Sequence, residues 1–245
     1  MLKTVGVKIL DGTPNYFVIE DIGQVSSTRH FEKLLQEAME YVTEKGIQSV
    51  SIVLNEKEVE NTDYLDILEA FDFGQQETQY FYKRDLSSFK EPREIESLEI
   101  KSIEQTTADL FIEVWQESMK GSFNVSSTLS VDKEFMGMKS ELGSGYAKSC
   151  LIAFFEKKPI GITMPHIEPG TVDEGRLFYF GLLPEYRRNG WGSTLHKHSL
   201  HILKNMGAAY YIGATGHKNI PMQHIFQANG CQMFEQKFTY RLKRI

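Results

Sequence analysis

Two glycines in a short basic turn are the residues of this chain with the clearest chemical use. The turn Arg187-Arg188-Asn189-Gly190-Trp191-Gly192 follows an apolar run at 176–183 and opens residues 191–206, whose apolar positions recur at helical spacing. A strand, a glycine turn and a helix in this order aim free backbone N–H groups, and the positive end of the helix dipole, at one point. Such a point binds an anion, most often a phosphate. The pattern therefore predicts a phosphate site.

The flanking residues narrow the choice of ligand. Residues 187–192 carry Arg, two variable residues, Gly, one variable residue and Gly, and residues 219–231 carry an Asn followed at fixed spacing by apolar residues and Gly230. In this order and separation the two motifs resemble the signatures of the GNAT superfamily of acyl-CoA-dependent N-acyltransferases. The resemblance covers roughly residues 96–245 and is strongest over 175–231. It implies acetyl-CoA as cosubstrate, no metal, and transfer of an acetyl group to a primary amine of a small molecule or peptide.

The resemblance also implies which residues contact the cosubstrate. The backbone at the end of the strand would pair with the pantetheine and the acetyl carbonyl, and the loop amides from Arg187 to Ser193 would hold the diphosphate. The expected cosubstrate contacts are Leu182, Leu183, Arg187, Arg188, Asn189, Gly190, Trp191, Gly192, Ser193, Asn219 and Phe226.

Acid and base are where the sequence departs from the family pattern. Phe226 stands where the family usually has a Tyr that protonates the departing thiolate, and Phe has no proton to give. The strand at 176–183 carries no carboxylate to act as general base. By position, the candidates are Tyr179, Glu174 and His217, of which His217 has the most suitable ordinary pKa, although a solvated loop histidine is the simpler interpretation. The substitution Phe226→Tyr would restore this hydroxyl with little change in side-chain volume, so the sequence predicts that the fold tolerates it.

Composition limits the other classes of function. The chain has 245 residues, 41% hydrophobic and 24% charged, and a net charge of −6, which argues against general nucleic-acid binding. The sequence predicts a cytoplasmic protein without a membrane partner, because no run has signal-peptide or membrane-helix character. Cys150 and Cys231 are predicted to be reduced core residues. His196, His198 and His201 do not share one helical face, so a solvated polar face is favoured over a metal site.

The first part of the chain repeats the order of the second. At offsets of about 158–160 residues its apolar positions coincide with those of the C-terminal half, although any two strand-helix segments share such periodicity. His30 and Glu32 fall at the places of Gly190 and Gly192, where a Cβ and a negative charge oppose phosphate binding. Residues 1–90 are therefore predicted to form a degenerate, non-catalytic lobe, and residues 96–245 the acyltransferase domain.

The expected architecture is an α/β (α+β) fold of GNAT type. It has a mixed, mostly antiparallel sheet flanked by helices, in a tandem arrangement with an incomplete N-terminal lobe. A binding-protein alternative is an acyl-CoA sensor or scaffold without turnover, favoured by Phe226 and by the lack of a carboxylate at 176–183. The sequence leaves open whether the protein is a monomer or a homodimer.

Overall fold

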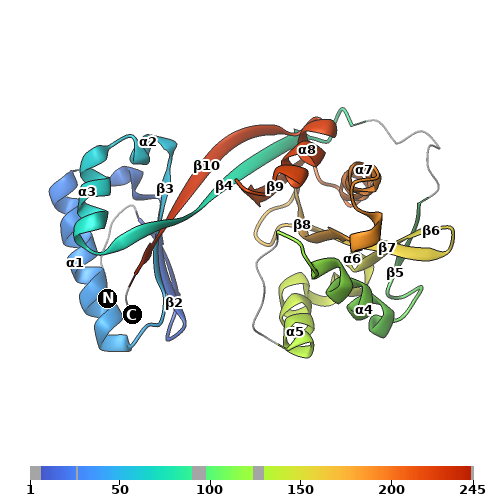
Figure 1. Ribbon diagram of the computed structural model, residues 1–245, viewed down its shortest axis with the longest axis horizontal. Coiled ribbons are helices and arrows are strands. Elements are labelled where there is room, and N and C mark those ends of the chain that lie inside the picture. Colours follow the sequence, from blue (N-terminus) through green and yellow to red (C-terminus); the bar gives the residue numbers. More distant parts are fainter. Residues whose placement is uncertain (1–6, 26, 90–97, 124–129, 244–245) are drawn as a thin grey trace. The chain divides into compact units, whose positions relative to one another are not determined.

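The computed structural model describes residues 7–25, 27–89, 98–123 and 130–243. The chain divides into two compact units (Figure 1). The first unit comprises Met1–Phe81 with Phe234–Ile245, and the second unit comprises Tyr82–Met233.

The strands follow one hydrogen-bonded order, β1-β2-β3-β10-β4-β9-β8-β7-β6-β5. Two neighbouring pairs, β2 with β3 and β8 with β9, run parallel. The pairs β1–β2, β3–β10, β5–β6, β6–β7 and β7–β8 are antiparallel. The expected mixed, mostly antiparallel sheet flanked by helices is therefore confirmed.

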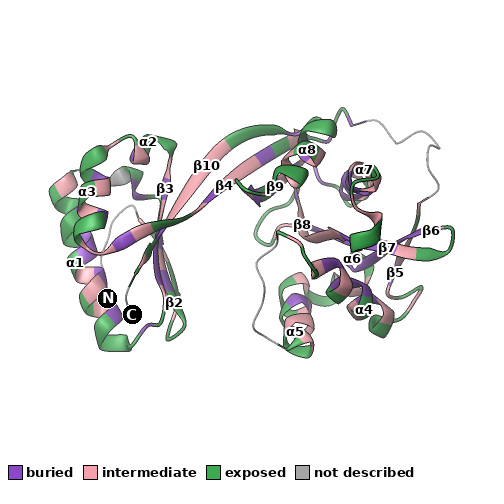
Figure 2. Ribbon diagram, viewed as in Figure 1, coloured by how far each residue is buried: buried purple, intermediate pink, exposed green. Residues whose placement is uncertain are grey.

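The first unit is built on one amphipathic helix. Helix α1 packs Phe31, Leu35 and Val42 against the strands, begins after the N-cap Ser27 and ends at Gly46 in the left-handed conformation. Figure 2 shows this face buried. The elements are β1 (Lys8–Gly12), β2 (Tyr16–Glu20), α1 (Thr28–Lys45), β3 (Val50–Asn55), α2 (Glu56–Val59), α3 (Thr62–Ala70), most of β4 (Phe73–Asp85) and most of β10 (Gln232–Leu242).

In the second unit, helices cover both faces of the strands. Helix α4 lies on one face and α7 on the other (Figure 1). Phe111 and Trp115 of α4 belong to one apolar cluster and Leu195 of α7 to another. The elements are β5 (Glu99–Ser102), α4 (Ala108–Met119), α5 (Val131–Leu142), α6 (Tyr146–Ser149), β6 (Leu151–Phe155), β7 (Lys158–Ile167), β8 (Glu174–Leu182), α7 (Trp191–Asn205), β9 (Tyr210–Gly216) and α8 (Ile220–Ala228).

The unit boundaries differ from the predicted domains 1–90 and 96–245. Strand β10 pairs with β3, from Lys237 opposite Asn55 to Arg241 opposite Ser51, so the end of the chain completes the first unit. Residues 82–89 instead belong to the second unit, where the N–H of Leu86 donates to the carbonyl of Ala209 at 2.8 Å. The polar stretch 85–94, which carries Pro92 and which the sequence predicts to be a linker, lies partly outside the described residues.

The elements of the two halves recur at the predicted offset. Strand β3 begins at Val50 and β9 at Tyr210, 160 residues later. Helix α3 begins at Thr62 and α8 at Ile220, 158 residues later. Each helix is followed by a long strand, β4 in the first case and β10 in the second.

Candidate active site

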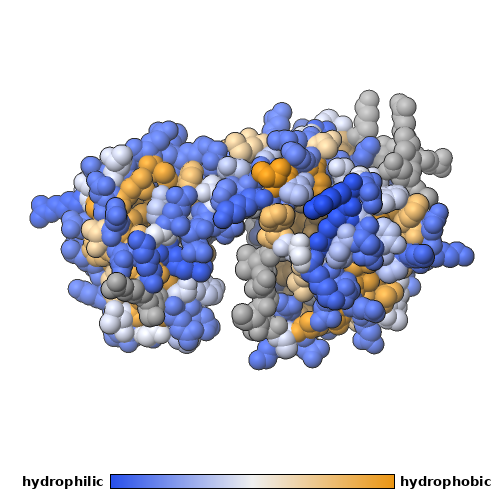
Figure 3. Space-filling view, in the orientation of Figure 1, coloured by the Kyte–Doolittle hydropathy of each residue, from blue (hydrophilic) through white to orange (hydrophobic). Residues whose placement is uncertain are grey.

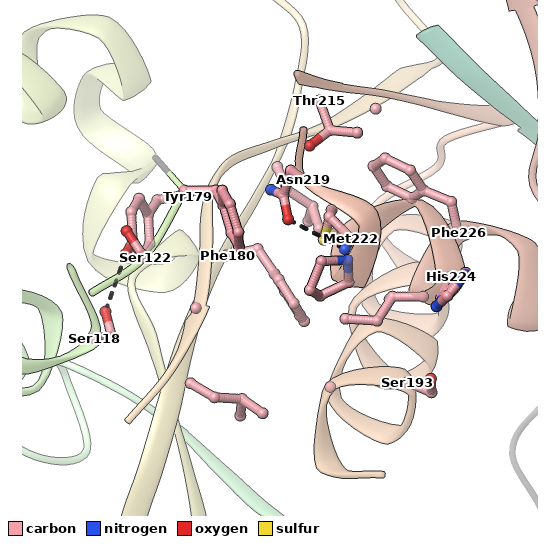
Figure 4. Close-up of a pocket in the computed structure, with 18 of the residues that line it drawn as sticks. Ser118, Ser122, Tyr179, Phe180, Ser193, Thr215, Asn219, Met222, His224 and Phe226 are labelled. Atoms are coloured by element: carbon pink, nitrogen blue, oxygen red, sulfur yellow. Dashed lines mark hydrogen bonds between the residues drawn. The ribbon is translucent and has the colours of Figure 1, made fainter. Parts of the chain in front are cut away.

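Strands β8 and β9 diverge and leave a cavity between them. Their parallel pairing covers Glu174 opposite Tyr210 and Gly175 opposite Tyr211. Residues 176–182 of β8, the paired Tyr211 and residues 212–215 of β9 line a cavity of about 720 Å³, together with the loop before α7, α8 and residues after α4 (Figure 4). On the surface of this unit, hydrophobic and strongly hydrophilic side chains lie side by side (Figure 3).

A β-bulge shapes the wall of the cavity that β8 forms. Thr163 of β7 lies opposite Phe180 and Pro165 lies opposite Leu177, so β8 advances three residues while β7 advances two. The extra residue falls at Phe178–Tyr179, and both of these side chains join the apolar cluster of α4. A bulge of this kind redirects side chains beside a site.

Leu182, and not Leu183, offers its backbone to the cavity. The N–H of Leu183 donates to the carbonyl of Ile160 at 2.9 Å, and its side chain is buried in the α4 cluster. Successive residues of an extended strand point their polar groups in opposite directions, so those of Leu182 face away from β7. The expectation that Leu183 contacts the cosubstrate is therefore not supported by this geometry.

The loop before α7 has the form of an anion site. Arg188 and Gly190 adopt left-handed conformations, with φ of 64° and 84°, and Gly190 is the N-cap of α7 without a side-chain cap. A Cβ built on Gly190 would meet nothing within 4 Å. The amides of the first helical turn have no intrahelical acceptor, and left-handed turns gather N–H groups around an anion. The residues present therefore fit a diphosphate.

Fewer amides can bind a diphosphate than the sequence predicted, which was the whole set from Arg187 to Ser193. The N–H of Arg187 donates to the carbonyl of Pro184 at 3.3 Å, and the N–H of Ser193 donates to the carbonyl of Gly190 at 3.1 Å. These two amides are already used within the chain. No hydrogen bond among the described residues engages the amides of residues 188–192, which leaves these for a ligand.

Gly192 and Trp191 serve packing more than ligand contact. A Cβ on Gly192 would lie 2.7 Å from Cδ1 of Ile225, so this glycine lets α7 approach α8 closely. The ring of Trp191 lies 4.5 Å from that of Phe155, centroid to centroid, in the apolar cluster of Leu195. Neither Trp191 nor Asn189 belongs to the cavity lining.

The guanidinium of Arg187 joins the loop to the end of α4. Its Nε donates to the carbonyl of Leu182 at 3.1 Å, Nη1 to that of Gly121 at 3.2 Å and Nη2 to that of Ser118 at 3.0 Å. These three bonds make Arg187 a positioning residue that fixes the loop, β8 and the segment after α4 relative to one another.

Of the three candidate bases, the structure brings Tyr179 to the cavity. Its hydroxyl oxygen accepts from Oγ of Ser118 at 3.2 Å (Figure 4). Its ring packs edge-on against that of Trp115. Glu174 is not in the lining, and its carboxylate accepts from Nε of Arg176 at 2.6 Å and from the hydroxyl of Tyr210 at 3.1 Å.

His217 lies outside the lining as well. Its side chain is exposed, and its backbone carbonyl accepts from Nε2 of Gln223 at 2.8 Å. The expected contact Asn219 does reach the cavity, but its side chain caps α8 by accepting from the N–H of Met222 at 3.2 Å (Figure 4).

Phe226 forms part of an aromatic floor. It is 1% exposed, and its ring centroid lies 4.7 Å from that of Tyr82, 5.4 Å from that of His196 and 6.2 Å from that of Tyr211. The cavity therefore meets an apolar ring at the position where the family carries a hydroxyl.

His196 is buried, in contrast to the polar face expected for it. Its exposed fraction is 0%, and neither ring nitrogen has a hydrogen-bond partner among the residues that the structure describes. Burial lowers the pKa of His196 to about 3, so the imidazole is neutral. Three aromatic rings, those of Phe180, Tyr211 and Phe226, surround it edge-on.

Several cavity residues were missed by reasoning from the sequence. Ser118, Arg176 and His224 line the cavity. Arg176 could have been noticed as the charged residue of an otherwise apolar strand, and His224 as a titratable residue inside the second motif. Ser118 had no comparable signal, since its place depends on how α4 packs against β8.

Among the residues that the structure describes, no three His, Cys, Asp or Glu side chains gather closely enough to hold a metal ion. Within the same residues, no helix combines the length and the apolar character needed to cross a membrane.

The comparisons with known proteins agree with this geometry. The model of the acetyltransferase (GNAT) family matches residues 103–231, which include β8, the glycine loop and α8. The chain belongs to this family. No curated protein matches the chain.

Solved structures share the fold across almost the whole chain. A GCN5-related N-acetyltransferase from Sphaerobacter thermophilus is 11% identical with a TM-score of 0.73, covering 96% of this chain and 75% of that one. A tandem GNAT protein from the clavulanic acid biosynthesis pathway is 12% identical with a TM-score of 0.62, covering 96% and 77%. A protein of unknown function from Staphylococcus epidermidis is 13% identical with a TM-score of 0.65, covering 94% and 85%. At these identities the likeness concerns the fold alone.

Proposed function

We propose that the protein is an N-acetyltransferase that moves an acetyl group from acetyl-CoA to a primary amine of a small molecule or peptide. The observation that carries the proposal is that two features occur together: the N-terminus of α7 has no side-chain cap, and β8 diverges from β9 beside it. The first feature suits a diphosphate and the second suits an extended arm beside a strand edge.

Each part of the site has a role in this proposal. Acetyl-CoA, when bound, supplies the thioester whose acetyl group is transferred. The amides of residues 188–192 hold the diphosphate, and the backbone of Leu182 pairs with the arm or the acetyl carbonyl. Arg187 keeps these two groups in register through its three carbonyl contacts. Positioning of this kind supplies much of the rate of an acyl transfer.

Deprotonation of the amine is the step for which the cavity offers the fewest suitable side chains. Among the described residues that line the cavity there is no Asp or Glu, so Tyr179 and His224 are its titratable groups other than Tyr211 and the arginines. We propose that the amine loses its proton to water, or to the phenolate form of Tyr179, whose oxygen accepts from Oγ of Ser118. The same observation favours the second candidate function, an acyl-CoA sensor without turnover.

One experiment separates the two functions. Purified protein is given acetyl-CoA with a panel of amines, peptides and aminoglycosides, and free thiol is measured together with CoA binding by calorimetry. Amine-dependent thiol release supports the enzyme. CoA binding without thiol release over the whole panel supports the sensor, and absence of CoA binding refutes both.

The first unit is proposed to be a degenerate GNAT-like lobe in a tandem arrangement. The recurrence of β3, α3 and β4 as β9, α8 and β10, each about 158–160 residues later, supports this origin. Its helix α1 caps its own N-terminus through Ser27, which argues against a second diphosphate site.

A further inference from the structure

We propose that Arg176 binds an anionic group of the acceptor, so that the acceptor is an amine that also carries a carboxylate or a phosphate. This inference rests on the proposed function and specifies its substrate class. It follows from the charges of the cavity and from the place of Arg176 within it.

The charged side chains of the cavity are all basic. Among the described residues that line it, the charged ones are Arg176, Arg187 and Arg188, and no carboxylate accompanies them. A polycationic acceptor such as a polyamine or an aminoglycoside would meet like charges there, which Glu174, bonded to Nε of Arg176, offsets only in part. An acceptor with an acidic group would be attracted.

The three arginines differ in their availability. The guanidinium of Arg187 donates hydrogen bonds to three backbone carbonyls, and Arg188 belongs to the loop that suits the diphosphate. Arg176 lies six residues before Leu182 on β8, which at about 3.3 Å per residue places it roughly 20 Å along the strand from the loop. Its charge is therefore at the other end of the cavity from the diphosphate site.

Arg176 also projects from the face of β8 that is opposite to α7. Thr163 hydrogen-bonds to Ser199 of α7 at 2.8 Å, and Phe180 lies directly across from it on the same face. Arg176 lies across from His166, three residues further along β7 and so on the other face. That face carries α4, whose end contributes Ser118 to the cavity. Arg176 is thus on the side away from the helix that would hold the cosubstrate.

One nitrogen of the Arg176 guanidinium is hydrogen-bonded, and the other two can donate to a ligand. Glu174 accepts from Nε at 2.6 Å and is itself fixed by the hydroxyl of Tyr210. No hydrogen bond to either Nη group of Arg176 is formed by the described residues. The side chain is 28% exposed and Glu174 is 12% exposed, so the pair is largely shielded from water. Glu174 offsets part of the charge, while the two Nη groups keep the fork geometry that binds a carboxylate or phosphate.

The test compares amines that differ in their acidic group. Calorimetry measures the binding of 4-aminobutyrate against butylamine, and of phosphoethanolamine against ethanolamine, to the full chain with and without saturating CoA. We expect at least one acidic member to bind about tenfold or more tightly than its partner. The pair that shows the difference identifies the anion as carboxylate or phosphate.

Variants link the preference to the residue. Arg176→Gln should remove the preference and Arg176→Lys should keep part of it, whereas Arg241→Gln removes an exposed arginine outside the cavity lining and should leave it unchanged. Thermal melts and CoA titrations show that each variant is folded. Equal or weaker binding of both acidic members, or an undiminished preference in folded Arg176→Gln, overturns the inference. Loss of CoA binding with an intact acidic preference would instead refute the proposed function alone.

Discussion

The ring of Tyr82 packs against the ring of Phe226, with 4.7 Å between centroids and 34° between planes. Phe226 lines the cavity, whereas Tyr82 comes from β4, which begins in the first unit. Arg84, two residues further along β4, donates from Nη1 to the carbonyl of Gly230 at 2.9 Å. The floor of the candidate site is therefore supported by a strand that precedes the predicted start of the domain at residue 96.

Tyr82→Ala should destabilise the second unit and weaken CoA binding. Tyr82 is 3% exposed, so truncation leaves a cavity beneath Phe226. Losses of about 3–5 kcal/mol are usual when a large buried ring is removed. Urea unfolding and CoA calorimetry measure the two effects. Lys83→Ala is the matched control, because Lys83 is exposed on the same strand and should change stability by less than about 1 kcal/mol. Similar losses in both variants would contradict the supporting role of Tyr82.

The contrast between the glycine loop and Tyr82 shows what the sequence could reveal. Gly190 and its helix are adjacent in the chain, so their arrangement follows from local rules for strands, turns and helices. Tyr82 meets Phe226 across 144 positions of sequence, and that contact depends on how β4 is placed in the sheet. Local periodicity carries no information about which strand becomes the neighbour of β9.

Arg187 and His196 show the same limit at the level of single side chains. The motif placed Arg187 in the loop, but its carbonyl acceptors Ser118 and Gly121 lie on a distant segment. His196 stands between Leu195 and Lys197 in the sequence, and it is fully buried because α7 turns this position toward Phe180. A helical pattern with several histidines and lysines could not show which histidine faces the sheet.

Gly190→Glu should abolish CoA binding. The substitution adds a side chain in a left-handed conformation and a negative charge at the N-terminus of α7. Gly170→Glu is the matched control, because Gly170 has a φ of 87°, meets nothing within 4 Å of a built Cβ and does not line the cavity. It should carry the same backbone strain and retain CoA binding. Calorimetry that finds unchanged CoA affinity in Gly190→Glu would remove the loop from the site.

One CoA molecule should bind each chain. The α1 helix of the first unit uses Ser27 as its N-cap, with the hydroxyl accepting from the N–H of His30 at 3.3 Å, and Glu32 adds a negative charge just beyond the first turn. The N-terminus of α7 has no such cap. Titration should therefore give a stoichiometry near one for the wild type and no binding for Gly190→Glu. Two equivalent sites, or one site that survives Gly190→Glu, would place CoA in the first unit.

Phe226→Tyr should be less well tolerated than its small change in volume suggests. A Cβ built on Gly213 would lie 2.8 Å from Cζ of Phe226, and the hydroxyl of Tyr211 lies against the same point. A second hydroxyl enters this buried space, so we expect a loss of about 1–3 kcal/mol. Tyr211→Phe frees room, and the double variant should recover part of the loss in a double-mutant cycle of urea unfolding. An additive cycle would show that the two positions do not share the space.

His196 should make the protein less stable as the pH falls from about 6.5 toward 3. In the unfolded chain an ordinary histidine takes up a proton near pH 6.5, whereas burial lowers the pKa of His196 in the folded protein to about 3. Between these values the unfolded state binds more protons, so the free energy of unfolding decreases by about 1.4 kcal/mol per pH unit, or about 2 kcal/mol from pH 7 to pH 5.

His196→Phe removes the titrating group from a site already lined by Phe180, Tyr211 and Phe226, and it should flatten this part of the profile. His217→Gln changes an exposed histidine and should leave the profile as it is. Urea unfolding at pH 5, 6 and 7 measures the slope in each protein. A slope in His196→Phe equal to that of the wild type would mean that other groups cause the acid sensitivity and that His196 is not held neutral by burial.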